Sequence, residues 1–227
     1  MTTTTLPARL LRNLTRLTGD EKHDAAAHST LDTLWVLHDR VLDLDPAHPD
    51  RPGRDRFLLS KGHGPASYYA VLATLGFFPE DWLDDLAGPD SPLGHHPDRL
   101  LVPGVEISSG SLGHGLPIAV GLVRGLEATG ERGDVHVLVG DAELDEGSNH
   151  EAIAVAGRWR LARLRCVVID NSSTSLGWPG GVARRFEVEG WSSAHAPVHD
   201  HDALHAALTT PSDRPHVTVV TTPPKES

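Results

Sequence analysis

Residues 135–147 read VHVLVGDAELDEG, and this stretch decides the fold. A largely apolar run stops at Gly140, and the carboxylate of Asp141 follows at once. In α/β proteins a buried parallel strand ends in this way and delivers an acid to the carboxyl edge of the sheet, where ligands bind. The stretch therefore predicts an α/β fold with its functional groups at one edge of a mainly parallel sheet.

A second apolar run, residues 166–169, lies about thirty positions further along and ends in Asp170-Asn171. The intervening residues 146–160 have the length and composition of a crossover helix. Such a connection is right-handed and joins parallel neighbours. We therefore expect a doubly wound sheet, flanked by helices, in which Asp141 and Asn171 lie side by side.

The chemistry of these two side chains favours a hard cation. One carboxylate oxygen and one amide oxygen suit Mg²⁺, which keeps its other positions for phosphate oxygens and water. A helix that begins near Asp145 would present backbone N–H groups to an anion. The pattern predicts a magnesium diphosphate site, although either residue alone could be an ordinary turn acid or loop asparagine.

Composition excludes several classes of function. The chain has 227 residues and a formal charge of -11, which argues against a nucleic-acid partner. It contains no apolar run long enough to cross a membrane. The single cysteine, Cys166, lies in an apolar run and is expected to be a small buried hydrophobic residue, so a reducing cytoplasm is the expected location.

The remaining pattern predicts alternating helices, strands and loops. Apolar residues recur at helical spacing over 31–42, and proline and charge mark a loop at 45–56. Further along we expect a strand at 57–59, helices at 66–75, 80–86 and 119–126, loops at 88–103 and 172–182, a strand at 191–198, a helix at 202–208 and a strand at 216–220.

Two loops combine glycine with polar groups that suit a ligand. SKGHGP, residues 60–65, follows the predicted strand, and ISSGSLGHGLP, residues 107–117, leads into a helix. Glycines there would let backbone approach a ligand closely. The pair His95-His96 could also clip a metal, but no third ligand lies at a recognisable spacing.

Together these motifs resemble the transketolase family. Gly140-Asp141-Ala142 followed by Asn171 is similar to its thiamine diphosphate signature, Gly-Asp-Gly through to Asn. Residues 59–63, LSKGH, match the family residue for residue, and residues 103–116 match PGVExSxGSLGQGL except that His114 replaces glutamine. The resemblance covers roughly residues 20–222.

The resemblance implies a set of site residues. Mg²⁺ would be held by Asp141, Asn171 and the carbonyl of Ser173. Catalytic roles would fall to His23, His63, His96 and Glu146, the last of which either joins two cofactor sites across an interface or is a helix first-turn acid. Thiamine diphosphate would lie against His63, Gly110, Ser111, Leu112, Gly113, Gly140, Asp141, Ala142, Glu143 and Asn171.

The family also implies the organisation of the molecule. We expect residues 1–19 to form an N-terminal tail and first helix, a transit peptide being the alternative, and residues 20–227 to form a single thiamine diphosphate and magnesium domain. In transketolases the glutamate that activates the cofactor belongs to another domain. The chain therefore resembles the N-terminal subunit of a split transketolase, paired with a C-terminal subunit in an α2β2 heterotetramer.

Such an enzyme would transfer a two-carbon ketol unit from a ketose phosphate to an aldehyde. One alternative is a subunit that passes the unit to a lipoyl or carrier-protein acceptor, and another is a non-catalytic partner. Two departures from the family bear on this choice. The glycines and proline that flank the histidine at the position of His23 are missing, and Ala142 replaces a glycine, which costs roughly 1 kcal/mol or more if φ there must be positive.

Overall fold

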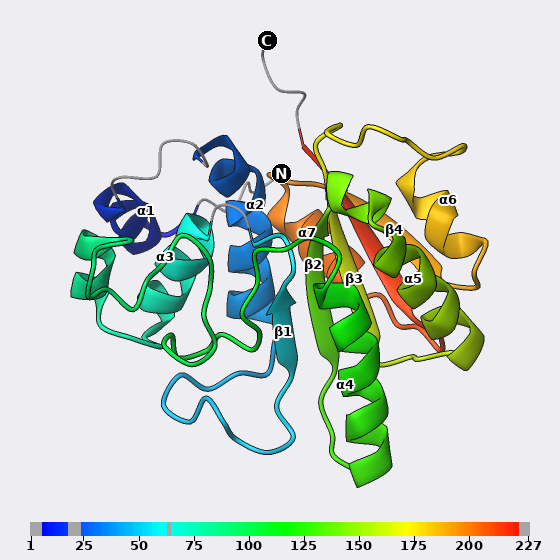
Figure 1. The fold of residues 1–227 in the computed structure, drawn as a ribbon, viewed down its shortest axis with the longest axis horizontal. Coiled ribbons are helices and arrows are strands. Elements are labelled where there is room, and N and C mark those ends of the chain that lie inside the picture. The colour runs from blue at the N-terminus through cyan, green and yellow to red at the C-terminus, as the bar shows by residue number, and fades with distance from the viewer. Residues whose placement is uncertain (1–5, 18–23, 63–64, 223–227) are drawn as a thin grey trace.

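The central sheet is wholly parallel. The computed structural model describes residues 6–17, 24–62 and 65–222, with backbone only for 24–29. Within these residues a five-stranded sheet has the order β1-β2-β3-β5-β4 (Figure 1). Its strands are β1 (Arg56–Leu59), β2 (Val135–Gly140), β3 (Leu164–Asp170), β4 (Ser192–Pro197) and β5 (His216–Thr221), each pair being parallel. The predicted doubly wound α/β fold is confirmed.

The two strands that decide the fold are neighbours, as predicted. All six residues of β2 are buried, because helices cover both faces of a parallel sheet and such strands become apolar throughout. Val137 pairs with Cys166 and Gly140 with Ile169. The N–H of Asp141 then continues the ladder by donating to the carbonyl of Ile169 at 3.0 Å. The ends of β2 and β3 therefore lie together at one edge.

Helices cover the sheet on both faces. One apolar cluster includes Leu138, Val167 and Val220 and packs with α1 (Ala8–Arg16), α2 (Asp24–Val36), α3 (Ala66–Leu75) and α7 (His201–Leu208). The other includes Val137, Val168 and Val219 and packs with α4 (Gly115–Thr129), α5 (Gly147–Trp159) and α6 (Val182–Glu187) (Figure 1). Alternate residues of each strand thus face opposite helical layers.

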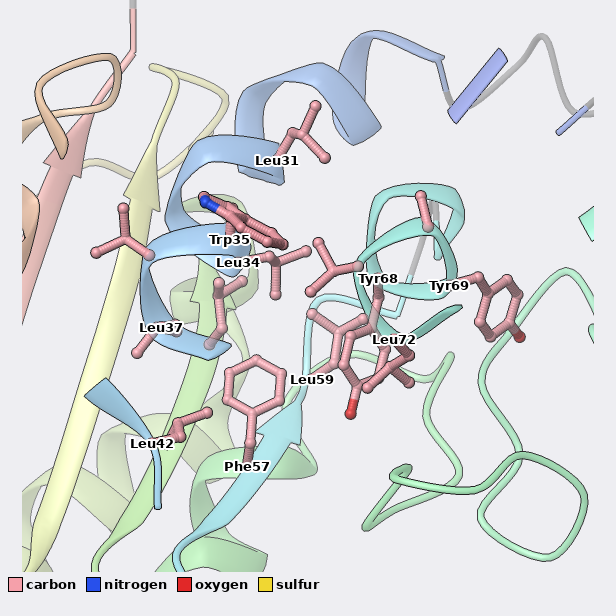
Figure 2. Close-up of a cluster of buried hydrophobic side chains, with 14 of the residues drawn as sticks. Leu31, Leu34, Trp35, Leu37, Leu42, Phe57, Leu59, Tyr68, Tyr69 and Leu72 are labelled. Atoms are coloured by element: carbon pink, nitrogen blue, oxygen red, sulfur yellow. The ribbon is translucent and has the colours of Figure 1, made fainter. Parts of the chain in front are cut away.

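Helix α2 presents its apolar side to β1 and α3. Leu34 and Trp35 lie above Phe57 of β1 and Tyr68 of α3 in this core (Figure 2). The helix does not end at Val36 but continues as a π-helical turn, η2 (Leu37–Val41), and Leu42 then adopts an extended conformation. The helix predicted over 31–42 is therefore present, with its last turn widened.

Two shorter elements complete the first layer. Helix α1 is anchored by Leu10, which is fully buried, and by Asn13, whose Nδ2 donates to Thr74 Oγ1 at 3.0 Å. The predicted short helix after α3 forms as the 3₁₀ helix η3 (Glu80–Asp85). Arg16 of α1 pairs with Asp84 of η3 at 2.6 Å. The amino-terminal helix therefore packs on α3 and η3.

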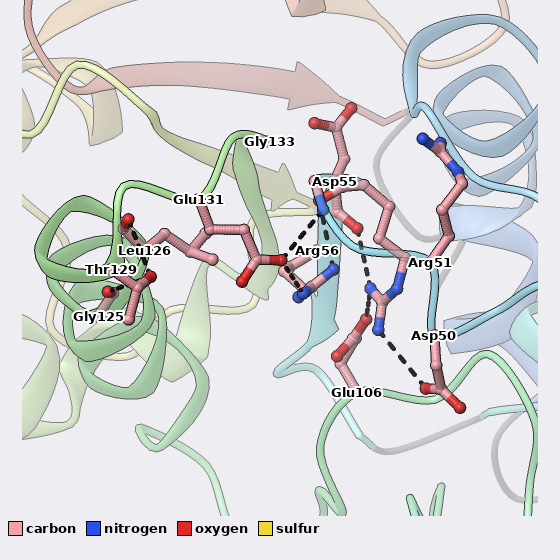
Figure 3. A network of polar contacts seen from close by, with 12 residues as sticks. Asp50, Arg51, Asp55, Arg56, Glu106, Gly125, Leu126, Thr129, Glu131 and Gly133 are labelled. Atoms are coloured by element: carbon pink, nitrogen blue, oxygen red, sulfur yellow. Dashed lines mark hydrogen bonds and ion pairs between the residues drawn. The ribbon is translucent and has the colours of Figure 1, made fainter.

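At the amino edge of the sheet, ion pairs close the loop at residues 43–55. Glu131 accepts hydrogen bonds from the N–H of Gly53 and from Arg56, both at 3.1 Å, and Glu106 pairs with Arg54 (Figure 3). These contacts lie at the end of the sheet away from Asp141. They hold the proline-rich loop at the amino end of β1.

A buried polar row crosses the sheet near the same edge. His136 on β2 pairs in register with Arg165 on β3, which pairs with His216 on β5. Burial lowers the pKa of His136 to about 3, helped by Arg165 and His38. Burial likewise lowers the pKa of His216 and of His38 to about 4. The fold therefore holds three imidazoles in the neutral form.

The segment after β3 differs in part from expectation. Residues 172–181 form a loop, as predicted, but α6 (Val182–Glu187) follows it, and the sequence pattern did not predict that helix. The strand expected at 191–198 is β4 and the helix expected at 202–208 is α7. Within the described residues no helix is long and apolar enough to span a membrane.

Candidate functional site

The carboxyl ends of β2 and β3 bring the predicted acid and amide to one place. Asp141 follows β2 directly and is 2% exposed. Asn171 follows β3, and its Oδ1 is buried with no hydrogen-bond partner among the described residues. A buried oxygen with no hydrogen-bond donor costs free energy. A positively charged group bound to that oxygen would offset the cost. A cation fits this requirement.

The loop after β3 folds onto Asp141. The N–H and the hydroxyl of Ser173 donate to the Asp141 carboxylate at 2.6 and 2.5 Å. The N–H groups of Thr174 and Ala142 add hydrogen bonds at 3.2 and 2.9 Å. Asp141 and Ser173, both predicted metal ligands, are therefore in direct contact.

The candidate cation ligands are oxygen atoms of several chemical types. In the part of the chain that the structure describes, no group of three or more His, Cys, Asp or Glu side chains could hold a metal. A cation at this edge would depend on the Asp141 carboxylate, the Asn171 amide oxygen and backbone carbonyls. Such oxygen ligands suit Mg²⁺ and not a zinc site built from thiolates and imidazoles.

Backbone geometry at Ser172 separates the two ligand positions. Ser172 has φ of +57°, a left-handed conformation that few non-glycine residues adopt. The side chain of Asp170 accepts from its N–H at 3.2 Å and supports that turn. Strain of this kind is found at functional sites. The turn at Ser172 lets the chain reverse between Asn171 and Ser173.

Ala142 is not strained. It begins the 3₁₀ turn η4 (Ala142–Asp145), and the described non-glycine residues with positive φ are Ala87, Arg160 and Ser172. The methyl group therefore costs no left-handed backbone strain. The departure from the glycine of the signature is compatible with the turn as it stands.

The glycine-rich loop packs tightly against the other motifs. Gly113 has φ of +84°, and a Cβ there would lie 2.6 Å from Ser148 Oγ. A Cβ on Gly62 would lie 2.7 Å from the backbone nitrogen of Gly110. The turn that begins at Ser60 and the loop at 107–115 therefore meet with no space for side chains at these positions.

Of the two adjacent histidines, His96 contacts both glycine-rich loops. The Nδ1 atom of His96 lies 2.9 Å from the carbonyl of Gly62, and a Cβ on Gly110 would lie 3.1 Å from its ring. His96 therefore packs on both glycine loops. The other predicted catalytic histidines, His23 and His63, lie outside the described residues.

Two acids of the 135–147 stretch have different surroundings. Glu146 is the N-cap residue of α5, is exposed, and makes no side-chain capping hydrogen bond within the described residues. Glu143 is 1% exposed and accepts hydrogen bonds from Ser60, Gly113 and Gly140. Burial raises the pKa of Glu143, and these hydrogen bonds oppose the shift.

Asp145 was not among the predicted site residues. It accepts hydrogen bonds from the hydroxyl of Thr174 at 3.0 Å and from the N–H groups of Ser175 and Leu176 at 3.2 and 3.3 Å. Burial acts to raise the pKa of Asp145, but these hydrogen bonds, led by Thr174, lower it overall. The sequence signals at this position were the run of acids after Asp141 and the expected helix start near Asp145.

Comparison with known proteins agrees with the family resemblance seen in the sequence. Residues 16–223 match the family model described as transketolase, thiamine diphosphate binding domain. A protein of Rhodococcoides fascians named ferredoxin fas2 is 51% identical over 210 residues, which cover 92% of this chain and 69% of that protein. One apulose-4-phosphate transketolase subunit, from Actinobacillus succinogenes, is 36% identical over 88% of this chain and 75% of its own length.

A solved structure gives the same fold. The transketolase from Leishmania mexicana superposes with a TM-score of 0.77 at 28% identity over 90% of this chain. The chain spans 37% of the length of that transketolase. It spans a larger share of the Actinobacillus succinogenes protein than of the solved enzyme.

Proposed function

The chain belongs to the transketolase family as a thiamine diphosphate-binding domain, and from this membership we propose that it is the N-terminal subunit of a two-component transketolase. The enzyme would be a transferase that moves a two-carbon ketol unit from a ketose phosphate to an aldehyde acceptor. The observation that carries the proposal is coverage: the chain matches 75% of a relative that is named as one transketolase subunit, but 37% of a solved transketolase.

The proposed cofactor is thiamine diphosphate with Mg²⁺. Asp141, Asn171 and the Ser173 carbonyl would hold the cation, and the buried Asn171 Oδ1, unpaired within the described residues, supports this assignment. The diphosphate would lie at the turn after Gly140. The loop at Gly110–Gly113 would lie along the cofactor, because its glycines leave room for close approach.

Bound thiamine diphosphate would supply the carbon chemistry by which a two-carbon unit leaves one sugar and joins another. The protein would position and polarise the reactants. We propose that His96, whose Nδ1 lies 2.9 Å from the Gly62 carbonyl, acts on the substrate side of the site. We propose the same substrate-side role for His23 and His63, since imidazoles can donate a hydrogen bond or exchange a proton near neutral pH.

A second subunit is part of the proposal. The relative from Actinobacillus succinogenes is named as one subunit of a transketolase. We propose that this chain pairs with a C-terminal subunit in an α2β2 heterotetramer in the cytoplasm, and that Glu146, exposed beside the site, faces that interface. The partner would supply the glutamate that activates the cofactor.

The Rhodococcoides relative is named a ferredoxin, but we do not infer an iron–sulfur site in this chain from that name. Clusters of the ferredoxin type are held by several cysteine thiolates, commonly four. The sequence has one cysteine, Cys166, which is 1% exposed in β3. Electron transfer by a protein-bound cluster is therefore not proposed for these residues.

Calorimetry with thiamine diphosphate and Mg²⁺ on the full chain tests the proposal. We expect Mg²⁺-dependent binding that Asp141→Ala and Asn171→Ala each weaken at least about tenfold, since each removes one of a few cation ligands. Absence of binding to the wild-type chain, alone and with the partner subunit, would overturn the cofactor assignment. Aldehyde release from ketose phosphates by the reconstituted pair would test the reaction.

A further inference from the structure

The Glu143 carboxylate joins three separate segments of the chain. Its Oε1 atom accepts from the hydroxyl of Ser60, which follows β1, and from the N–H of Gly113, before α4, the latter at 2.9 Å. Its Oε2 atom accepts from the N–H of Gly140, the last residue of β2, at 3.3 Å. We call these residues, with Gly115, the Glu143 network.

The network extends through Ser60 to the first turn of α4. Ser60 Oγ accepts from the N–H of Gly115 at 2.9 Å. The contact is close, because a Cβ on Gly115 would overlap the Ser60 side chain. Ser60 is 1% exposed and Glu143 is equally buried, so water does not compete for these hydrogen bonds.

Neighbouring side chains reinforce the same segments. Asn149 Nδ2 of α5 donates to the Glu143 carbonyl at 2.6 Å, and Ser148 Oγ donates to the Gly113 carbonyl at 2.6 Å. Helix α5 therefore holds both the turn that contains Glu143 and the glycine-rich loop. Both the N–H and the carbonyl of Gly113 are therefore hydrogen-bonded, and these bonds fix the loop.

All three hydrogen bonds are donated to the two oxygens of Glu143. Ser60, Gly113 and Gly140 all donate to Glu143, and the Ser60 hydroxyl has only one proton to give. A glutamine at this position would turn its NH₂ group toward at least one of these donors. The network is therefore specific for a carboxylate and not merely for a side chain of this size.

We propose that Glu143 is a positioning residue. It fixes the loop at Gly110–Gly113 and the turn at Ser60–Gly62 beside Asp141. In this way it sets the affinity for the diphosphate cofactor without contacting the cofactor. The proposal rests on the proposed function, since the ligand is the cofactor assigned above. The physical basis is conformational entropy. Loops that are already ordered in the folded protein lose less conformational freedom when the cofactor binds. Glu143 lies two residues after Asp141 in the same turn, so one turn supplies both the cation ligand and the clamp.

The test compares Glu143→Gln with Glu131→Gln in the full chain. Glu131 is a suitable control because it also accepts a backbone N–H and a side-chain donor, at the opposite edge of the sheet. We expect Glu143→Gln to weaken thiamine diphosphate binding in saturating Mg²⁺ by about tenfold or more, the usual effect of losing hydrogen bonds to a buried charge. Glu131→Gln should leave the dissociation constant unchanged.

Hydrogen exchange measured by mass spectrometry gives a readout that needs no cofactor. We expect Glu143→Gln to speed amide exchange in residues 107–116 and 58–62, and Glu131→Gln not to do so. A lower melting temperature without faster exchange in these segments and without weaker cofactor binding would overturn the proposal. Equal cofactor binding by wild type and Glu143→Gln would overturn it as well.

Ser60→Ala keeps the inference testable if Glu143→Gln does not fold. It removes only the hydroxyl that joins Glu143 to Gly115, so we expect a smaller loss of cofactor affinity in the same direction. The double variant should bind no more weakly than Glu143→Gln alone, because both changes act on one network. Additive effects would overturn the idea of a single network.

The outcomes distinguish this inference from the proposed function. If the wild-type chain binds no thiamine diphosphate, the proposed function fails. The exchange comparison then decides whether Glu143 fixes the two segments. If the wild type binds and neither Glu143→Gln nor Ser60→Ala weakens binding, the proposed function stands and the positioning role fails.

Discussion

Ser173 donates both its N–H and its hydroxyl to the carboxylate of Asp141, at 2.6 and 2.5 Å. The predicted cation ligand thus accepts two hydrogen bonds from the loop after β3. A cation that binds Asp141 has to replace at least one of these donors, because the two compete for the same oxygen lone pairs. If Mg²⁺ binds Asp141 as proposed, the loop after β3 would therefore change its contacts.

Ser173→Ala tests this competition. Removing the hydroxyl takes away one of the two hydrogen bonds to Asp141 Oδ1, the other being donated by the Ala142 N–H, and leaves the Ser173 carbonyl in the backbone. We expect the Mg²⁺ concentration that gives half-maximal cofactor binding to fall by about threefold to tenfold, in line with one hydrogen bond to a charged acceptor. Calorimetric titration at several Mg²⁺ concentrations measures it. A higher Mg²⁺ requirement would show instead that the hydroxyl prepares the site.

Asp145→Asn should loosen the segment at residues 174–176. Thr174, Ser175 and Leu176 all donate to Oδ2 of the carboxylate, and a neutral amide oxygen at that place would accept these hydrogen bonds more weakly than a charged one. We expect limited proteolysis within residues 172–181 to become about tenfold faster at neutral pH, because local opening costs less free energy. Asp213→Asn, at an exposed ion pair with Arg160, is the control and should cleave at the wild-type rate.

The buried histidines predict a loss of stability in acid. Their pKa values in the folded protein, about 3 for His136 and about 4 for His38 and His216, lie below that of an unfolded histidine, about 6.5. The unfolded chain then binds more protons, so the free energy of unfolding falls as pH drops from about 6.5 toward 4. Urea unfolding at pH 7.5, 6.0 and 5.0 measures the decline.

A variant of the row isolates this effect. His136→Leu removes a titrating group whose Nδ1 has no hydrogen-bond partner among the described residues, so the stability of this variant should depend less on pH than that of the wild type. His48→Ala, at a side chain that is 74% exposed, should keep the wild-type slope. An unchanged slope in His136→Leu would contradict the assignment of acid sensitivity to the row.

Glycine to alanine changes at two positions should have opposite effects. At Gly113, φ is +84° and the added Cβ would meet Ser148 Oγ at 2.6 Å, so Gly113→Ala should destabilise the fold and abolish cofactor binding. At Gly121, inside α4, no described atom outside the helix lies within 4 Å of the added Cβ. Gly121→Ala should raise the free energy of unfolding by about 0.5–1 kcal/mol, because alanine loses less backbone entropy in a helix.

Chemical denaturation of both variants measures the difference. Gly113 lies just before the start of α4 and Gly121 lies inside that helix. Destabilisation by Gly121→Ala of more than about 1 kcal/mol, the full helix-propensity difference between the two residues, would mean that the outer face of α4 is covered in solution.

Much of the fold follows from local pattern. The apolar runs that end at Asp141 and Asn171 were sufficient to predict adjacent parallel strands, because strands buried on both faces have few polar residues. Helix α6 was missed because the glycines and proline before it conceal a helix start. Its six residues give too short a pattern to show helical spacing.

The site was less predictable where it depends on contacts between distant segments. The contacts of His96 with Gly62 and Gly110 join loops far apart in the chain, so the pair His95-His96 alone does not indicate them. Whether Ala142 is strained depends on φ, which the residue type does not fix. Two of the partners of Glu143, Ser60 and Gly113, come from segments far from it in the chain, so no local pattern could indicate that its carboxylate is enclosed.

The register of β1 has a consequence for synthesis on the ribosome. Arg56 pairs with Val135, so the first strand has no neighbour in the described sheet until more than half of the chain has been made. Sheets formed by such distant pairings fold slowly and leave strands exposed meanwhile. The apolar segment Phe57-Leu58-Leu59 would therefore have no partner strand of the described sheet until Val135 has been synthesised.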